Sequence, residues 1–452
     1  MRQSPSELLA AKVERGLFSV RPPQAMLISF LSLSLFGALM LMTPFASHHG
    51  TSWSQALFTA VSAVTVTGLG VVDIGTHFTL FGQWVLLLLI QLGGLGVMTF
   101  GVFIMVVAQS RMSMQHRAAL GEALSEHRHA NLRGVLVAMF AFTFVMEALG
   151  TALLAIQWVP ELGWSKGLYF SFFHAVSAFN NAGVSLRPDN LIAYAGSPLI
   201  NLVITTLFIF GGIGFVVVAD VMRTRRFRDF TLHTKVMLVA TAIINVVAML
   251  GFLVLEYGNP ATLGAMPDTA DRLWGAWFHG VTPRTAGFNT VNVAGLLPST
   301  ALMMMGLMFI GGGSGSTASG IKLTTFVVML AATRAFILGQ ERPVLFGRGI
   351  DPSLILKAMS IAIISLFCVI TGTFILTVTE KAPFLDLAFE AVAAFSTAGM
   401  TRNVTGTLSL PGQFVIMALM LIGRVGPLTL AFTLANRRRA PIQYPDGRLT
   451  IG

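Results

Sequence analysis

The sequence predicts an all-α polytopic membrane protein of four pseudo-repeats, each a span, a pore half-helix and a second span, arranged around one pore. Composition and apolar stretches support the membrane assignment: 54% of the 452 residues are hydrophobic, 11% are charged, and the mean hydropathy is +0.77. Soluble domains do not combine such values. Apolar stretches such as 25–45 and 235–255 match the roughly 20 residues that cross a bilayer. We expect eight transmembrane helices and four re-entrant half-helices.

The basic residues predict the orientation. Although the net charge is +10, most of the 29 Lys and Arg fall in the N-terminal segment, near 111–133, 223–235 and 334–357, and in the tail. This positive-inside pattern predicts cytoplasmic termini, and it explains the charge without nucleic-acid binding. The N-terminus has no signal-peptide cleavage pattern and is expected to be retained. Cys368 is the one cysteine, which excludes a disulfide within the chain.

A fourfold repeat organises the chain. The segments "FTAVSAVTVTGLG", "FHAVSAFNNAGVS", "FHGVTPRTAGFNT" and "FEAVAAFSTAGMT" begin at Phe58, Phe173, Phe278 and Phe389. A glycine follows the Phe by ten residues in three of them and by nine in the third. The predicted divisions are a cytoplasmic N-terminus 1–24, repeats at 25–115, 116–230, 231–345 and 346–436, and a cytoplasmic tail 437–452.

Each repeated segment is about a dozen residues long, which is too short to cross the membrane. We expect a re-entrant half-helix that enters from outside and returns as extended chain. Backbone without helical hydrogen bonds is tolerated at membrane depth only if it lines a water-filled cavity or is buried in protein. Four such segments around one axis predict a pore.

The glycines after the half-helices predict a cation filter. Rings of backbone carbonyls can replace the hydration shell of a cation, glycine adopts the required backbone angles cheaply, and helix C-termini add partial negative charge. The predicted filter residues are Thr65, Val66, Thr67, Gly68, Asn181, Ala182, Gly183, Thr285, Ala286, Gly287, Thr397, Ala398 and Gly399. The alternative is that these glycines serve only helix packing.

The second spans carry a further repeated motif: "GGLG" at 93–96, "GGIG" at 211–214, "GGSG" at 312–315 and "GRVG" at 423–426. Small residues at one depth permit close approach or bending. In the third repeat the motif is expanded to "GGGSGSTASG". Such a segment cannot hold a stable helix, because each Gly costs about 1 kcal/mol relative to Ala, and it cannot face lipid with unpaired amides. We therefore predict a gate inside the pore, formed by Gly311, Gly312, Gly313, Ser314, Gly315, Ser316, Thr317, Ala318, Ser319, Gly320 and Arg424.

The four filter segments, the expanded glycine stretch and "GRVG" resemble the Trk/Ktr/HKT superfamily of potassium transporters, over essentially the whole chain from residue 25. Eight spans without an additional N-terminal pair are most similar to KtrB-like membrane subunits. A glycine in the first filter segment, here Gly68, resembles the potassium-selective members of this superfamily. The chain departs from the pattern at Pro283 and Arg284, where the third filter segment is one residue shorter.

The resemblance implies potassium uptake across the bacterial cytoplasmic (inner) membrane, with K⁺ at the filter carbonyls and stimulation by Na⁺. It implies no covalently bound cofactor. It also implies a homodimer in membrane lipid, assembled on a cytosolic nucleotide-binding ring similar to KtrA. In such proteins the third-repeat loop is a gate below the filter, and an arginine of the fourth repeat, here Arg424, faces it.

Several other polar residues have open interpretations. Lys322 is expected at the cytoplasmic edge of the loop, and Glu147 is either an ion site or a paired acid in a span. His174, His279 and Glu390 share the position after the repeat Phe, where capping or packing is favoured over a proton relay. Asp73 and Asp189 either concentrate cations at the outer mouth or lie in solvated loops.

Two other functional classes compete. An intramembrane serine protease would need Ser314 beside His174 or His279, but the histidines are expected outside and Ser314 at or below the midplane. A sodium-coupled or sodium-selective secondary transporter with rocking repeats usually shows inverted or twofold repeats. The four repeats here are parallel, which favours a channel-like pore.

Overall fold

The computed structural model describes residues 22–110 and 132–426. Most of the predicted N-terminal segment, the boundary between the first two repeats and the predicted tail lie outside these residues. The described part is helical, as the sequence predicts, and belongs to a multi-pass membrane protein. Five of its helices are long and apolar enough to cross a membrane: α2 (Pro22–Leu41), α5 (Leu80–Ser110), α8 (Leu132–Leu162), α12 (Leu232–Glu256) and α16 (Pro352–Thr379).

Four of these long helices each pack against a shorter helix that follows in the sequence. The shorter helices, called half-helices below, are α3 (Trp53–Val64), α9 (Trp164–Phe179), α13 (Thr269–Val281) and α17 (Phe384–Phe395), paired with α2, α8, α12 and α16. Helix α3 begins with a capping box in which Ser52 and Gln55 bond each other's backbone amides, which satisfies donors at a helix start. The half-helices lie where the repeated Phe segments predict them.

The second helices of the repeats differ from one another. Helix α5 runs without a break through its glycine motif, whereas α10 (Pro198–Ile213) and α11 (Phe215–Thr224) meet at 94°. The bend lies at Gly214, whose φ is +99°. Helices α14 (Pro298–Phe309) and α15 (Leu323–Ile337) are separated by the glycine-rich loop, and α18 (Leu410–Val425) is capped by Gly426.

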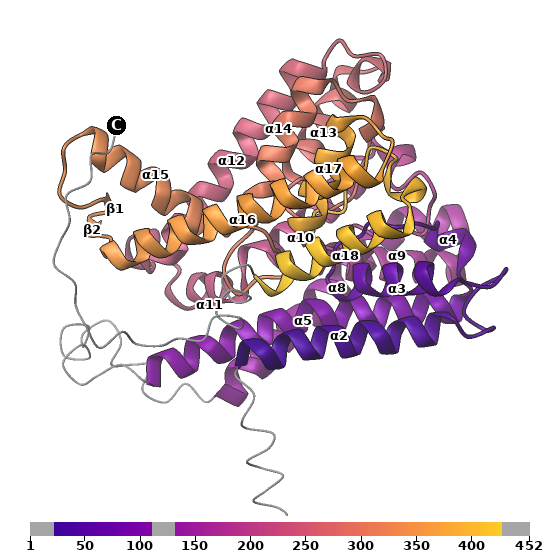
Figure 1. Cartoon of the computed structure of the whole chain (residues 1–452), viewed down its shortest axis with the longest axis horizontal. Coiled ribbons are helices and arrows are strands. Elements are labelled where there is room, and N and C mark those ends of the chain that lie inside the picture. Colours follow the sequence, from indigo (N-terminus) through magenta and orange to yellow (C-terminus); the bar gives the residue numbers. More distant parts are fainter. Residues whose placement is uncertain (1–21, 111–131, 427–452) are drawn as a thin grey trace, which may run out of the picture.

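Short elements complete the chain. They are α4 (Ile74–His77), the 3₁₀ turns η2 (Ile192–Tyr194), η3 (Phe227–Asp229), η4 (Leu263–Ala265), η5 (Val293–Gly295) and η6 (Thr405–Thr407), and the strands β1 (Val344–Leu345) and β2 (Arg348–Gly349). The two strands form a small antiparallel hairpin that pairs Val344 with Gly349 and Leu345 with Arg348. The hairpin lies beside α15, at the opposite end of the molecule from α4 (Figure 1).

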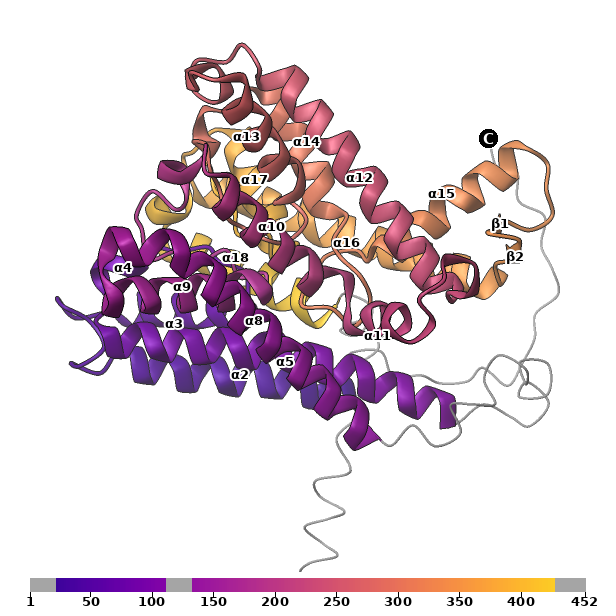
Figure 2. The same ribbon diagram turned by 180° about the vertical axis from the view of Figure 1, so that it is seen from behind.

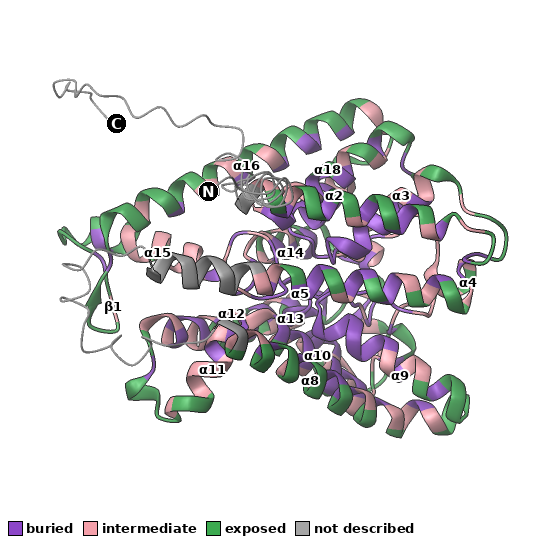
Figure 3. Cartoon of the chain, turned by 90° about the horizontal axis from the view of Figure 1, so that it is seen from below, coloured by how far each residue is buried: buried purple, intermediate pink, exposed green. Residues whose placement is uncertain are grey.

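The helices of the first and third repeats lie on opposite sides of the molecule. In both side views, α2, α3 and α5 lie on one side of the molecule and α12, α13 and α14 lie on the opposite side (Figures 1 and 2). Buried residues concentrate toward the interior, and exposed residues are frequent on the outer helices (Figure 3). Many of the exposed residues are large and apolar, for example Phe144, Val254 and Phe367. Such an apolar exterior suits contact with lipid.

Candidate ion pore and intramembrane loop

The four predicted filter segments share one backbone conformation. In each segment the glycine and the residue two positions before it have a positive φ. These pairs are Val66 and Gly68, Asn181 and Gly183, Thr285 and Gly287, and Thr397 and Gly399. A positive φ is uncommon for residues other than glycine, so its recurrence at one position in all four repeats indicates one shared turn of the chain. The shorter third segment adopts it as well.

The filter glycines form a closed ring. Each lies against the carbonyl oxygen of the residue that precedes the filter glycine of the next repeat. The pairs are Gly68 with Ala182, Gly183 with Ala286, Gly287 with Ala398, and Gly399 with Thr67. A Cβ built on any of the four would lie under 3.0 Å from that oxygen. The order runs through the four repeats and returns to the first, so the segments meet at one axis and leave no room for a side chain.

Polar side chains fix the chain at the filter. Thr65 Oγ1 donates to Val61 O at 2.7 Å and lies 2.7 Å from Thr67 Oγ1. The Asn181 amide joins two other parts of the chain, because it lies 3.2 Å from Thr285 Oγ1 and 3.1 Å from Thr317 Oγ1. All six residues are buried. The second filter segment is therefore bonded to the third segment and to the glycine-rich loop.

A buried carboxyl supports the second filter segment from behind. Glu147 of α8 is 3% exposed and accepts from Gln91 Nε2 at 3.2 Å and from Asn180 Nδ2 at 3.1 Å. Asn180 caps the C-terminus of α9 and immediately precedes the filter. Of the two interpretations of Glu147, the paired acid describes this geometry. Gln91 and Asn180 are not among the residues predicted from the sequence, although Gln91 is a polar residue within an apolar span and Asn180 directly precedes the predicted filter.

Arg284, where the sequence departs from the family pattern, lies behind the third filter segment. It is 9% exposed, and its Nη1 donates to Asn245 Oδ1 on α12 at 3.0 Å. Half-helix α13 ends at Val281, six residues before Gly287, whereas the other three end four residues before their filter glycine. Pro283 lacks an N–H donor and disfavours continuation of the helix. The shortened sequence is thus absorbed by an earlier helix end.

The predicted gate segment is a buried loop that crosses between repeats. Gly313 N donates to Gly212 O at 2.8 Å, and Thr317 N donates to Gly211 O at 3.2 Å. The loop returns beside its own start, where Gly311 N donates to Ile321 O at 2.9 Å. With the contact of Thr317 to Asn181, these bonds place the loop against the second repeat, next to the filter. Most of its residues are buried, but Ser314 is exposed.

Arg424 joins the loop to the fourth and first repeats. Its Nη1 donates to the carbonyl of Thr317 and to Ser319 Oγ, the latter at 3.1 Å, and its Nη2 donates to Gly93 O at 3.0 Å. The side chain is 4% exposed. Lys322, at the end of the loop, donates to Ala318 O at 2.6 Å and precedes α15. The guanidinium of Arg424 thus bridges three repeats, as planar arginine donors allow.

The glycine motifs of the second spans permit close packing, as predicted. In three repeats the first glycine lies against the carbonyl of the last residue of the half-helix. The pairs are Gly93 with Val64, Gly211 with Phe179, and Gly423 with Phe395. In the third repeat the loop residues Gly311 and Gly312 instead lie against Ser319, Ala318 and Gly212.

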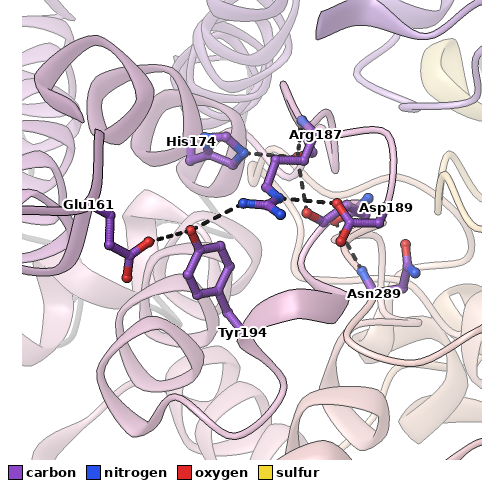
Figure 4. A network of polar contacts seen from close by, with 8 residues as sticks. Glu161, His174, Arg187, Asp189, Tyr194 and Asn289 are labelled. Atoms are coloured by element: carbon purple, nitrogen blue, oxygen red, sulfur yellow. Dashed lines mark hydrogen bonds and ion pairs between the residues drawn. The ribbon is translucent and has the colours of Figure 1, made fainter. Parts of the chain in front are cut away.

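The two acids that one interpretation places at the outer mouth have local partners. Asp73 caps α4 by accepting from Thr76 N at 2.8 Å, and Asp189 pairs with Arg187 at 3.1 Å. Arg187 also donates to Tyr194, which donates to Glu161 at 2.7 Å (Figure 4). Local structure therefore accounts for both acids.

His174, His279 and Ser314 do not form the arrangement of a serine protease. His174 Nε2 lies 3.0 Å from Ser185 Oγ, and His279 Nε2 accepts from the backbone of Thr290 and Val291. Among the described residues, neither histidine is bonded to Ser314, so no base is positioned beside that serine.

Comparison with known proteins identifies the family of the chain. The family model described as "TrkH: Cation transport protein" matches residues 22–439. The chain belongs to the TrkH family. Within it, the chain is 48% identical over 431 residues to the Ktr system potassium uptake protein B of Bacillus subtilis, which covers 95% of this chain and 97% of that protein. It is 41% identical to the protein of the same name from Vibrio alginolyticus, with 95% of each covered.

Two further relatives of this TrkH-family chain are informative. The potassium/sodium uptake protein NtpJ of Enterococcus hirae is 37% identical over 440 residues, with 95% of this chain and 97% of that protein covered. The crystal structure of the potassium transporter TrkH from Vibrio parahaemolyticus matches with a TM-score of 0.71 over 90% of this chain and 83% of that one. Because the sequence identity to that structure is 17%, it supports the fold alone. The resemblance stated from the sequence is confirmed at the level of the family.

Proposed function

We propose that this chain takes up potassium across the bacterial cytoplasmic membrane through a channel-like pore. The observation that carries the proposal is the closed ring of four filter glycines, each with a positive φ and each against the carbonyl of the next repeat. Such a ring supplies oxygen ligands for a dehydrated cation without a charged side chain. The potassium uptake proteins of Bacillus subtilis and Vibrio alginolyticus, at 48% and 41% identity, support potassium as the ion.

In this proposal the loop 311–320 is the gate. It lies against the second filter segment through Thr317 and Asn181, and Arg424 holds it from the fourth repeat. Because loop and filter are bonded, an ion leaving the filter meets the loop. A cytosolic partner that moves α15 would displace the loop, at a coupling energy of about 1–3 kcal/mol.

The remaining parts of the proposal concern assembly and topology. The name "Ktr system" of two relatives supports a membrane subunit that works with others, here a homodimer on a cytosolic nucleotide-binding ring. The repeat boundaries at 25–115, 116–230, 231–345 and 346–436, cytoplasmic termini and stimulation by Na⁺ belong to the same proposal. A sodium-coupled or sodium-selective transporter is the second candidate, and the relative named potassium/sodium uptake protein favours keeping it.

Uptake measurements distinguish a potassium pore from a sodium-selective transporter, the second form of the other candidate. The chain is expressed in cells that lack their own potassium uptake, with and without a cytosolic nucleotide-binding subunit, and initial rates are measured for K⁺ and for Na⁺. The proposal predicts K⁺ uptake well above Na⁺ uptake, increased by the partner and by added Na⁺. Uptake of Na⁺ at the same or a greater rate than K⁺ would favour the second candidate.

A further inference from the structure

One position recurs directly after the repeat Phe in all four half-helices. It holds Thr59, His174, His279 and Glu390, and all four side chains are buried. The last three are larger polar groups within a membrane protein, where an unpaired polar group is costly. Their partners therefore indicate what the position does.

In the second and fourth repeats this side chain bonds the hydroxyl of the residue eleven positions later. His174 Nδ1 lies 2.8 Å from Phe170 O, so Nδ1–H donates there and Nε2 accepts from Ser185 Oγ at 3.0 Å (Figure 4). Glu390 accepts from Thr401 Oγ1, and also from Thr405 Oγ1 at 2.7 Å. An imidazole and a carboxyl thus make the same connection.

The third repeat makes the connection through the backbone. His279 Nε2 accepts from Thr290 N at 3.0 Å and from Val291 N at 3.2 Å. Thr290 is again eleven residues after the histidine. In each of the three repeats the filter glycine lies between the two bonded residues. The bond therefore closes a loop of chain that contains the filter and fixes the returning segment to its half-helix.

The first repeat lacks this connection. Thr59 is shorter than histidine or glutamate, and eleven residues later the chain has Gly70, which has no side chain. Thr59 Oγ1 is buried and has no hydrogen-bond partner. A second connection occurs only in the second and third repeats as described: Ser177 Oγ bonds Val184 and Thr282 Oγ1 bonds Phe288. The equivalent Ser62 makes no such bond among the described residues, and the fourth repeat has Ala393 at this position, so the first repeat is the one that lacks both connections.

We propose that His174, His279 and Glu390 are positioning residues for the filter. Each is called a strut here, because its hydrogen bond holds the returning segment at a fixed distance from its half-helix. The first repeat has no strut and is therefore the part of the ring that moves most easily. This proposal rests on the proposed function, because it assigns the struts to a selective filter. In this proposal the struts hold the separation of the carbonyl oxygens, and that separation contributes to the discrimination between K⁺ and Na⁺. Removing a strut lets one quarter of the ring move and accept the smaller Na⁺.

The test removes the hydroxyl partner and keeps the half-helix intact. Ser185→Ala removes the hydroxyl that bonds His174 in the second repeat. Thr401→Val removes one of the two hydroxyls that bond Glu390 in the fourth repeat, and the double variant Thr401→Val/Thr405→Val removes both. Ser185→Thr keeps a hydroxyl and serves as the conservative variant. Thr59→Val is the matched control, because it removes a hydroxyl that has no partner at the equivalent position. Initial K⁺ and Na⁺ uptake rates are measured for each at equal membrane content.

We expect the ratio of K⁺ to Na⁺ uptake to fall roughly threefold to tenfold in Thr401→Val and Ser185→Ala, a change of the size that the loss of one hydrogen bond causes. It should stay at the parent value in Ser185→Thr and Thr59→Val. A role in folding alone would lower both rates together and leave the ratio unchanged. If one strut variant does not insert, the other decides the result.

A filter variant, Gly399→Ala, is measured alongside. If it leaves the ion ratio unchanged, the filter assignment itself fails. If Gly399→Ala lowers the ratio while Thr401→Val and Ser185→Ala behave like Thr59→Val, the filter stands and the struts are refuted. The strut proposal is also refuted if Thr59→Val lowers the ratio as much as Thr401→Val does.

Discussion

Replacing Arg424 by Met should open the pore in the absence of a partner. Methionine keeps the apolar length of the side chain and removes the donors to Thr317, Ser319 and Gly93. Two of these bonds hold the loop. A hydrogen bond from a charged group contributes about 1.5–3 kcal/mol, but water in the pore replaces part of it, so we expect a loss of about 2 kcal/mol. That energy changes the ratio of closed to open loop by roughly 30-fold.

The assay is K⁺ uptake by membrane vesicles that contain the chain without a cytosolic partner. We expect Arg424→Met to raise the initial rate at least several-fold and to retain the preference for K⁺ over Na⁺, since the filter is untouched. Arg272→Met is the matched control, because Arg272 also donates to a backbone carbonyl, that of Met266, away from the loop. A rate for Arg424→Met no higher than that of Arg272→Met, at equal insertion, would refute the role of Arg424 in closing the loop.

Three further predictions concern the loop, the glycine motif of α5 and the histidine at position 77. Deleting three or four residues between Gly313 and Ser319 should raise uptake and reduce its dependence on a partner; vesicle flux without the partner checks this, and an unchanged rate in a correctly inserted variant would exclude the loop as the gate. Gly93→Ala should destabilise the protein by about 1–3 kcal/mol because its Cβ overlaps the Val64 carbonyl, whereas Gly96→Ala, which has open space, should be neutral or stabilising by up to about 1 kcal/mol; equal melting temperatures in detergent would contradict the packing. Burial, followed by the nearby His49 and His48, lowers the pKa of His77 despite Asp73. Because a lowered histidine pKa favours the neutral form in the folded state, its contribution to stability is present above the unfolded pKa near 6.5 and is lost as pH falls through the folded pKa. The melting temperature should therefore fall less between pH 7 and pH 5 in His77→Gln than in the parent, and identical pH profiles would contradict this assignment.

The sequence predicts the repeated parts of the fold well because each repeat carries the same local signals. In each repeated segment a Phe is followed nine or ten residues later by a glycine, and these pairs locate α3, α9, α13 and α17. The glycine-rich composition of 311–320 predicts a break in the second span of the third repeat, and the break lies between α14 and α15. Even the shortened third segment is explained locally, since Pro283 ends the helix early and leaves Thr285 and Gly287 in the shared conformation.

The sequence does not predict features that depend on contacts between repeats. The motifs at 93–96 and 211–214 look alike, yet α5 continues through Gly96 while the chain bends by 94° at Gly214. At the second motif, the loop backbone bonds Gly211 and Gly212, which competes with helical hydrogen bonding there. The support of Asn180 by Glu147 and the bond between Thr317 and Asn181 join residues far apart in the sequence, so no local pattern reveals them.

The most direct test of the central claim, that four glycines shape a potassium filter, is the ratio of K⁺ to Na⁺ uptake in Gly68→Ser. A side chain at Gly68 would overlap the carbonyl oxygen of Ala182 and must displace it from the ring. Gly96→Ser is the control, because Gly96 has no neighbour within 4 Å of the added Cβ. We expect the ratio to fall at least tenfold in Gly68→Ser, which corresponds to about 1.4 kcal/mol of lost discrimination, and to stay unchanged in Gly96→Ser. A parent-like ratio in an inserted, transporting Gly68→Ser protein would contradict the filter.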